Sequence, residues 1–304
     1  MIVDVHTHTP THRSPVADHE QSWNTAYRPD KAVKLFVSWH EYEEAFAEAG
    51  VDVSLVFNIA RPPNPSAEED QISWRSLNDR TAEFADADRT HRIGFMSVLP
   101  DDPAAIEEIE RCTSDLGLKG IKLAPNYQRF DPLSPNAYAV YRAAEQRGLP
   151  IMFHQGTSAV THAPLRYAHP LAMDEIAMQH PELRIVMAHM GHPWQADTIA
   201  VVRKHPHVYA DISALFYRPW SFYCGMRLAT EWSILDKLLF GSDFPIIAPG
   251  ETLVGLRNVN APIAGTALPA VPLEAVESII HRNSLELLGL APGEQPSHPI
   301  EDSA

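Results

Sequence analysis

Cysteine is scarce in this sequence: only Cys112 and Cys224 occur among 304 residues, and neither belongs to a C-x-x-C pair. We therefore expect two free thiols, which are typical of a reducing compartment, and no disulfide framework. Long apolar runs are missing as well. No stretch approaches the roughly 18 residues that a membrane span needs, and the first residues do not have the form of a secretory signal. These absences favour a cytoplasmic protein without a membrane partner.

Positive charge is also in short supply. The chain has 24 Lys and Arg residues against 39 Asp and Glu residues, which gives a formal net charge of −15 at pH 7. A nucleic-acid backbone or an anionic membrane would be repelled by such a protein before any specific contact formed. We therefore expect a small-molecule substrate and no nucleic-acid partner. The sequence leaves open a homodimer or a higher homo-oligomer.

The first ten residues, MIVDVHTHTP, contain two histidines separated by one residue at the end of an apolar run. The β-branched residues before the pair suit a buried strand, and Pro10 ends it. In an extended strand His6 and His8 project to the same side, on the order of 7 Å apart at the Cα level. Two imidazoles at this spacing can bind one metal ion, although an isolated H-x-H is more often part of a polar surface loop.

Strand and helix patterns alternate along the rest of the chain. Strand candidates begin near residues 2, 53, 92, 118, 150, 184, 208 and 237. Helical patterns cover about 40–49, 73–88, 103–115, 136–148, 171–179, 195–204, 252–260 and 272–289. Eight such units predict an α/β fold of the (β/α)₈ TIM-barrel type, and an open Rossmann-type sheet is disfavoured because residues 6–12 contain no glycine. We expect a single domain over 1–290 and a polar tail over 291–304.

Polar residues follow several of these strands at the ends where a barrel of this type builds its active site. They are His6 and His8 after the first strand, His154 after the fifth, His189 after the sixth and Asp243 after the eighth. Imidazoles and a carboxylate suit Zn²⁺ or a similar first-row ion. Taken singly, His154 and His189 would more often be ordinary core or rim histidines, but the coincidence of all five favours a metal site.

The order of these motifs resembles the amidohydrolase superfamily. H-T-H, M-F-H, A-H-M-G-H-P-W and G-S-D-F-P follow the first, fifth, sixth and eighth strands, and R-N-S-L-E-L-L-G resembles the closing helix of the family. More closely, the chain is similar to the amidohydrolase 2 branch, which is related to aminocarboxymuconate semialdehyde decarboxylase. The resemblance covers essentially the whole barrel.

The resemblance implies the roles of the polar residues. His6, His8, His154 and Asp243 would bind one divalent metal, Zn²⁺ or alternatively Mn²⁺, while His189 and Asp243 would act as the catalytic acid–base groups. The expected function is that of a metal-dependent hydrolase acting on a small carboxylated or aromatic molecule through metal-activated water. The first alternative is a non-oxidative decarboxylase of an aromatic or unsaturated acid. The second is a catalytically inactive barrel used for binding.

Five further residues are candidates for substrate contact or remain unassigned. Arg61, Arg218 and Trp220 follow predicted strands and could offer a carboxylate clamp and a ring wall. Binuclear members of the superfamily use a carboxylated lysine where this chain has Lys122, but a buried or substrate-facing lysine is the favoured interpretation. His192, in the G-H-P-W turn, is either a substrate group or a loop-packing histidine and is left out of the predicted catalytic set.

Overall fold

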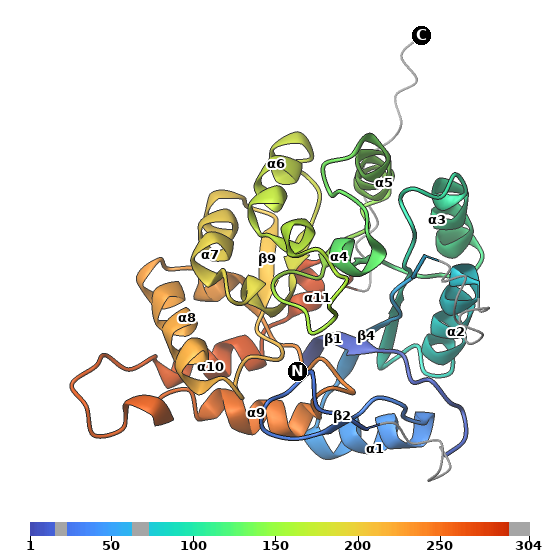
Figure 1. The fold of residues 1–304 in the computed structure, drawn as a ribbon. Coiled ribbons are helices and arrows are strands. Elements are labelled where there is room, and N and C mark those ends of the chain that lie inside the picture. The colour runs from blue at the N-terminus through green and yellow to red at the C-terminus, as the bar shows by residue number, and fades with distance from the viewer. Residues whose placement is uncertain (16–22, 63–72, 292–304) are drawn as a thin grey trace.

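Eight parallel strands form the centre of the computed structural model, which describes residues 1–15, 23–62 and 73–291, and helices surround them (Figure 1). The eight strands are β1 Val3–His8, β4 Val53–Phe57, β5 Arg92–Phe95, β6 Ile121–Leu123, β7 Ile151–Phe153, β8 Ile185–Met187, β9 Val208–Asp211 and β10 Leu238–Leu239. All eight lie in segments for which the sequence predicts a strand. A two-stranded antiparallel hairpin, β2 Trp23–Asn24 with β3 Val33–Lys34, is added by the first loop.

The eight strands form a closed ring. They pair as two parallel sheets, in the orders β1-β4-β5 and β10-β9-β8-β7-β6. Backbone hydrogen bonds join the sheets at both edges. Met96 N donates to Gly120 O at 2.8 Å between β5 and β6, and Val5 N donates to Phe240 O at 3.0 Å between β1 and β10. The predicted TIM-type barrel is therefore confirmed.

The helices follow the strands in alternation. They are α1 Trp39–Ala49, α2 Trp74–Asp86, α3 Ala105–Ser114, α4 Pro125–Gln128, α5 Pro135–Gln146, α6 Leu171–Gln179, α7 Gln195–Lys204, α8 Pro219–Glu231, α9 Pro249–Arg257, α10 Leu273–Ile280 and α11 Ser284–Leu287. The helix that the sequence predicts over 272–289 is thus two helices, α10 and α11. The long helix α8, which the sequence does not predict, lies between β9 and β10.

Helix α1 illustrates how local sequence sets an element. Ser38 accepts a hydrogen bond from Glu41 N, and the Glu41 side chain accepts one from Ser38 N, which makes a capping box at the beginning of the helix. Gly50 ends it in the left-handed conformation with φ 69°. Between these ends Tyr42 and Phe46 lie one turn apart and are buried, so α1 packs its apolar face against the barrel.

The inside of the barrel is filled by apolar side chains from most of the eight strands. Val5 of β1, Leu55 of β4 and Met152 of β7 belong to one buried cluster. Leu285 and Leu288, from the end of the chain, join the same cluster, and α11 contacts β1. The closing segment therefore packs against the barrel.

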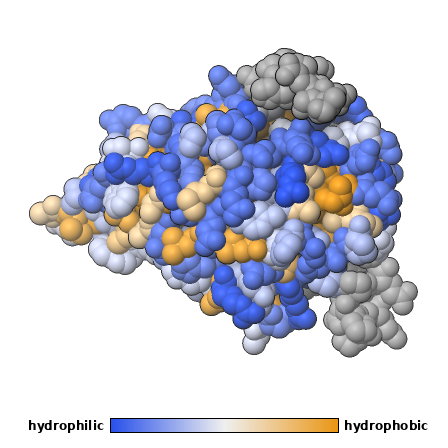
Figure 2. Space-filling view, turned by 90° about the horizontal axis from the view of Figure 1, so that it is seen from above, coloured by the Kyte–Doolittle hydropathy of each residue, from blue (hydrophilic) through white to orange (hydrophobic). Residues whose placement is uncertain are grey.

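The molecular surface is mixed in character. Figure 2 shows a face that is mostly hydrophilic, with hydrophobic residues in small groups among the polar ones. Across the described residues there is no helix with the length and apolar character needed to cross a membrane. Residues 292–304, which make up nearly all of the predicted polar tail, lie outside the described part of the chain.

Candidate metal centre and active site

One cavity collects the polar residues at the strand ends. Its volume is about 560 Å³, and it opens where the strands finish. His6 and His8 are on β1, His154 directly follows β7, His189 lies in the turn after β8, and Asp243 follows β10. All five of these predicted site residues line the cavity. The structure therefore brings the five together around one space.

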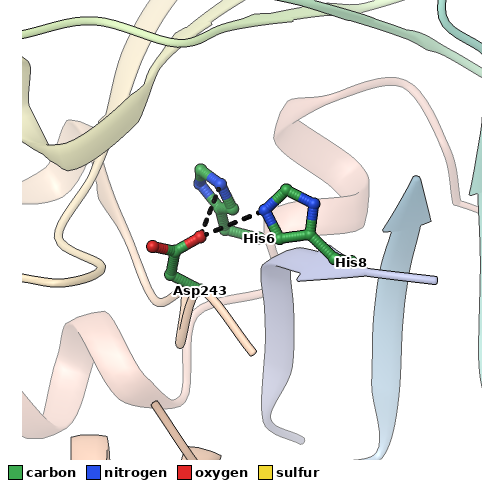
Figure 3. Close-up of side chains that lie close together, drawn as sticks. All are labelled: His6, His8 and Asp243. Carbon is green, nitrogen blue, oxygen red and sulfur yellow. Dashed lines mark ion pairs between the residues drawn. The ribbon is translucent and has the colours of Figure 1, made fainter. Parts of the chain in front are cut away.

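Three of these side chains converge closely. Nε2 of His6 and Nε2 of His8 each lie 3.3 Å from Oδ1 of Asp243 (Figure 3). One ligand atom from each of the three residues falls within a common span of 4.8 Å. Two imidazole nitrogens and a carboxylate oxygen in this arrangement match the donor set that Zn²⁺ and similar divalent ions prefer. The site therefore fits a divalent metal by the chemistry of its donors.

Backbone features where β1 meets the segment after β10 orient these donors. β1 contains a one-residue bulge between Asp4 and Thr7, so its pairing with β4 shifts just where His6 stands. Gly241 lets the two segments approach, because a Cβ there would lie 2.8 Å from the Cβ of His6. Asp243 has φ 68°, a left-handed conformation that few non-glycine residues adopt. The arrangement is thus held by tertiary packing and goes beyond local preference.

The protonation of the donors suits a cation. Burial, together with the positive charge of Lys122, lowers the pKa of His6 to about 4, so its ring is neutral at pH 7. Burial would raise the pKa of Asp243, but the hydrogen bond from His8 and the nearby histidines hold it well below its usual range. At neutral pH the site therefore offers a neutral imidazole at His6 and a negative charge at Asp243.

Asp211, at the end of β9, organises the site, and the sequence analysis does not single it out. Its Oδ2 lies 2.8 Å from Nδ1 of His6, and its Oδ1 accepts a hydrogen bond from Oγ of Ser213 at 2.5 Å. Burial alone would raise the pKa of Asp211, but electrostatic attraction to His6 and hydrogen bonds from His6 and Ser213 outweigh burial and hold this pKa well below its usual range. A carboxylate that is ionised and hydrogen-bonded on both oxygens fixes where its neighbours carry their protons.

Two tautomers follow from these contacts. Because Asp211 only accepts, Nδ1 of His6 carries the proton and Nε2 keeps its lone pair toward Asp243. Ser213 donates its hydroxyl proton to Asp211, so its Oγ accepts from Nδ1 of His189 at 2.8 Å. With Nδ1 donating to Ser213, Nε2 is the His189 nitrogen that can accept a proton. The grouping of His6, His189 and Asp211 is accordingly a hydrogen-bonded cluster, since 2.8 Å leaves no room for an ion between His6 and Asp211.

His154, the remaining predicted ligand, lies apart from the close group. Its Nε2 is 3.3 Å from the backbone oxygen of Thr157, and its ring stands 4.8 Å from that of Tyr127 and 5.2 Å from that of His189. Burial lowers the pKa of His154 well below the usual value, so this ring too is neutral. It borders the cavity as a neutral imidazole but does not share the 4.8 Å span of His6, His8 and Asp243.

Lys122 points into the barrel at the same place. Its Nζ lies 3.3 Å from Nε2 of His6 and 4.5 Å from the centre of the Phe57 ring, and the residue is only 1 % exposed. Burial lowers the pKa of Lys122 to about 8. The structure thus places this lysine against the donor atoms.

The predicted substrate contacts divide into two groups. Arg61 and Arg218 line the cavity, as does His192. Trp220 stands on α8 with 57 % of its surface exposed and does not line the cavity that the described residues form. Tyr27, from the first loop, also lines it, so that loop covers part of the site.

The chain is similar to known proteins in both sequence and fold. A family model described as amidohydrolase matches residues 3–290. The 5-carboxyvanillate decarboxylase of Sphingomonas paucimobilis is 17 % identical, with a TM-score of 0.64 over 94 % of this chain and 98 % of that one. A dihydroxybenzoic acid decarboxylase from Polaromonas sp. JS666, solved with bound manganese and 2-nitroresorcinol as inhibitor, is 16 % identical, with a TM-score of 0.65 over 95 % and 97 %.

A third similar structure has a different chemistry in its name. It is a probable 2-pyrone-4,6-dicarboxylic acid hydrolase from Acinetobacter baumannii with citric acid bound. It is 16 % identical to this chain, with a TM-score of 0.60 over 95 % of this chain and 99 % of that one. At these identities the likenesses establish the shared barrel fold.

Proposed function

The chain belongs to the amidohydrolase family whose model it matches, and from this premise we propose that it is a metal-dependent hydrolase of a small carboxylated or aromatic molecule. The observation that carries the proposal is the role of Asp211. Its single carboxylate, directly and through Ser213, leaves Nε2 of His6 available to a metal and Nε2 of His189 available to a proton. Hydrolysis by activated water requires such a metal ligand and a general base close to each other.

His6, His8 and Asp243 would hold the metal, and His154 borders the same space as a further neutral imidazole. When bound, a divalent ion supplies Lewis-acid polarisation of oxygen and eases the deprotonation of water. We propose Zn²⁺, because nitrogen donors outnumber the carboxylate oxygen in this set. The manganese in the Polaromonas decarboxylase makes Mn²⁺ the alternative.

His189 would accept and return the proton. Its Nδ1 is hydrogen-bonded to Ser213, so Nε2 is the nitrogen that would exchange a proton with water or substrate. The residue also has a left-handed backbone, with φ 56° and ψ 28°, a conformation that non-glycine residues adopt mainly where the surrounding structure requires it. His189 is therefore held in place by its fold context and by Ser213 together.

Decarboxylation is the second candidate, and two observations favour it. Arg61 and Arg218 line the cavity and could hold a carboxylate in a bidentate manner. In addition, two of the similar barrel structures are decarboxylases of aromatic acids. The cavity could thus orient an acid for loss of CO₂ with His189 as the proton donor to carbon.

Paired variants test the metal and base assignments. His189→Ala should keep its metal and lose turnover by at least about a hundredfold, since a positioned acid–base group contributes that much or more. His6→Ala should lose the metal itself. Metal content is measured by elemental analysis of both purified variants, and equal loss in the two would make His189 a ligand and overturn its assigned role.

Two substrate panels test the reaction type. The zinc-loaded enzyme is incubated with esters, lactones and amides in one panel and with hydroxybenzoates and unsaturated acids in the other. We expect acid release from the first panel, followed as a pH change. Metal-dependent CO₂ release from the second panel alone would replace hydrolysis by decarboxylation. Turnover in neither panel by a metal-loaded protein would favour a binding barrel.

Two coarser expectations complete the proposal. We propose that residues 1–290 act as a single catalytic domain, which the span of the family match supports. We also propose a cytoplasmic location, which is consistent with two cysteines that form no disulfide, one buried and one exposed.

A further inference from the structure

His192 lies in the turn between β8 and α7 and lines the cavity without belonging to the metal or base groups. Its Nδ1 lies 2.9 Å from Nε2 of Gln195 and 3.3 Å from Oγ of Ser221. Nε2 of Gln195 also donates to Oγ of Ser221 at 3.1 Å. One ring nitrogen of His192 is therefore occupied by two side chains from α7 and α8.

These contacts select one tautomer. The amide nitrogen of Gln195 can only donate, so Nδ1 of His192 must accept. A neutral imidazole with an accepting Nδ1 carries its proton on Nε2. Burial and the nearby positive charge of Arg218 lower the pKa of His192 to about 4, so the ring is neutral at pH 7. His192 thus keeps an N–H group for a partner other than Gln195 and Ser221.

The backbone fixes the turn at the cavity wall. Thr157 N donates to the carbonyl oxygen of His192 at 2.7 Å. The segment after β7 can come this close only because residue 156 is glycine, since a Cβ there would lie 2.1 Å from the same oxygen. The glycine also has φ 93°, which a side chain would strain.

Arg218 lines the same cavity and supplies a positive charge that acts on His192. Its Nη1 donates to Ala214 O at 3.2 Å, and its guanidinium stacks over the Tyr217 ring with a distance of 4.5 Å to the centroid. Within the described residues, no carboxylate forms an ion pair with this guanidinium. Its contacts with residues 1–15, 23–62 and 73–291 are neutral, and among these residues it keeps donors for a ligand in the cavity.

We propose that Nε2–H of His192 and the guanidinium of Arg218 form a subsite that binds a carboxylate of the substrate, separate from the metal ligands. Gln195 and Ser221 are positioning residues, because they act through the tautomer of His192. This proposal rests on the proposed function and deepens it by assigning a carboxylate-bearing substrate. A neutral donor beside a cation suits an anion without adding a further positive charge to a cavity that Arg61 and Lys122 also line.

The tautomer is tested first, in the metal-loaded wild-type protein at pH 7. Two-dimensional ¹⁵N–¹H spectra of labelled histidine distinguish a protonated Nε2 from a protonated Nδ1, and the His192 signals are those absent from His192→Phe. We expect Nε2 protonated and Nδ1 bare. The opposite tautomer would overturn the proposal without any reference to turnover.

Binding is tested by calorimetry on zinc-loaded protein with two probes, benzene-1,3-dicarboxylate and its monoamide, 3-carbamoylbenzoate. Wild type should prefer the dicarboxylate, and His192→Phe and Arg218→Met should each weaken its binding by about ten- to a hundredfold, as expected for hydrogen bonds to a charged group. Their affinity for the monoamide should change much less. His207→Phe removes a histidine that lies outside the cavity lining and should match wild type.

Gln195→Met tests the positioning role. Met has a similar volume but no donor, so the His192 signals should move toward a mixture of tautomers and dicarboxylate binding should weaken several-fold. A wild-type protein without preference for the dicarboxylate, or His192→Phe with wild-type binding, would overturn the subsite. If the preference depends on His192 while neither substrate panel is turned over, the subsite stands and the proposed hydrolysis fails.

Discussion

At the scale of single residues, Asp211 has the widest influence on the site. Besides His6 and Ser213, it accepts hydrogen bonds from the backbone nitrogens of His189 and Ser213, both at 3.0 Å. A carboxylate can accept on both oxygens, whereas an amide has one oxygen and one NH₂ group. The chemistry of this position therefore requires aspartate.

Asp211→Asn should weaken metal binding by about ten- to a hundredfold, the usual effect of disturbing a group that orients a ligand. If the amide NH₂ faces His6, the proton of that ring moves to Nε2 and the lone pair for the metal is lost. If it faces Ser213 instead, the amide N–H groups oppose the backbone N–H groups of His189 and Ser213, which are also donors. The metal affinity is measured by competition with a chromophoric chelator.

The control for this change is Asp236→Asn, which alters charge equally at an exposed position. We expect the control to bind metal as wild type does. Wild-type affinity in Asp211→Asn would contradict the assignment of the His6 tautomer and with it the role of Asp211.

At the scale of elements, helices α2 and α3 are joined by a buried carboxylate. Oε1 of Glu108 accepts from Asn78 Nδ2 at 2.9 Å, and both oxygens of Glu108 accept from the Arg111 guanidinium at 2.8–2.9 Å. Asn78 in turn hydrogen-bonds both backbone groups of Ser97, which follows β5. Glu108 thus links two outer helices to the barrel.

Glu108→Gln should lower the free energy of unfolding by about 1.5–3 kcal/mol, because it removes the charge that Arg111 pairs with in a buried place. The matched control is Glu107→Gln on the same helix, where the side chain is 76 % exposed. We expect it to stay within about 0.5 kcal/mol of wild type. Urea unfolding followed by tryptophan fluorescence measures both, and equal effects would refute the buried linkage.

The contribution of Glu108 should also depend on pH. Burial would raise the pKa of Glu108, but hydrogen bonds from Arg111 and Asn78 outweigh it and lower the pKa overall. The folded state therefore holds this carboxylate ionised to lower pH than the unfolded chain does. The stabilisation is present above about pH 4.3 and declines as the pH falls below that value. Glu108→Gln should lack this decline.

Elements were predictable where local sequence agrees with packing. Helix α1 has both a capping box and a terminal glycine, so its bounds follow from sequence. Helix α8 begins PWSFYCGM, where aromatic and glycine residues are weak helix formers, and it is stabilised by tertiary burial of Phe222 and Met226, one turn apart. Local propensity therefore does not indicate it.

The segment 272–289 also shows that local sequence does not determine every helix. The apolar pattern over 272–289 predicts one helix, but the structure ends α10 at Ile280. Arg282 then donates to the backbone oxygens of Leu235 and Leu238, both at 3.2 Å, and the chain turns so that Leu285 packs against the barrel. Contacts that are distant in sequence decide this break, so periodicity cannot reveal it.

The residues of the candidate site also differ in how far the sequence reveals them. His6, His8 and Asp243 were predictable because each lies in a short polar motif that follows an apolar strand. Asp211 also ends a strand, within VYADIS, yet its role depends on hydrogen bonds to residues of β1 and of the segment after β8. Gln195 is recognisable only through its contact with His192. The hydrogen bonds that give Asp211 its role join residues distant in sequence, so no local motif reveals it.

At the scale of the whole molecule, the candidate metal site lies across the seam where the barrel closes. His6 and His8 come from the first strand, and Asp243 follows the last one. The seam is also held by backbone hydrogen bonds, from Asp243 N to His6 O and from His8 N to Phe244 O, both at 2.8 Å. An ion bound by these residues would cross-link the beginning and the end of the barrel sequence.

Metal binding should therefore stabilise the barrel, and most strongly at its seam. At a free metal concentration of 100 times the dissociation constant, the gain is about 2.7 kcal/mol, because the ion binds the folded state alone. Removing metal with a chelator should lower the melting temperature, and adding Zn²⁺ should restore it.

In hydrogen exchange, the amides of residues 5–8 and 240–244 should lose more protection on metal removal than those of α3 and α5, which lie away from the seam. His8→Ala should abolish both responses. A melting shift without a protection change at the seam would place the ion elsewhere, and no shift at all would refute the cross-link.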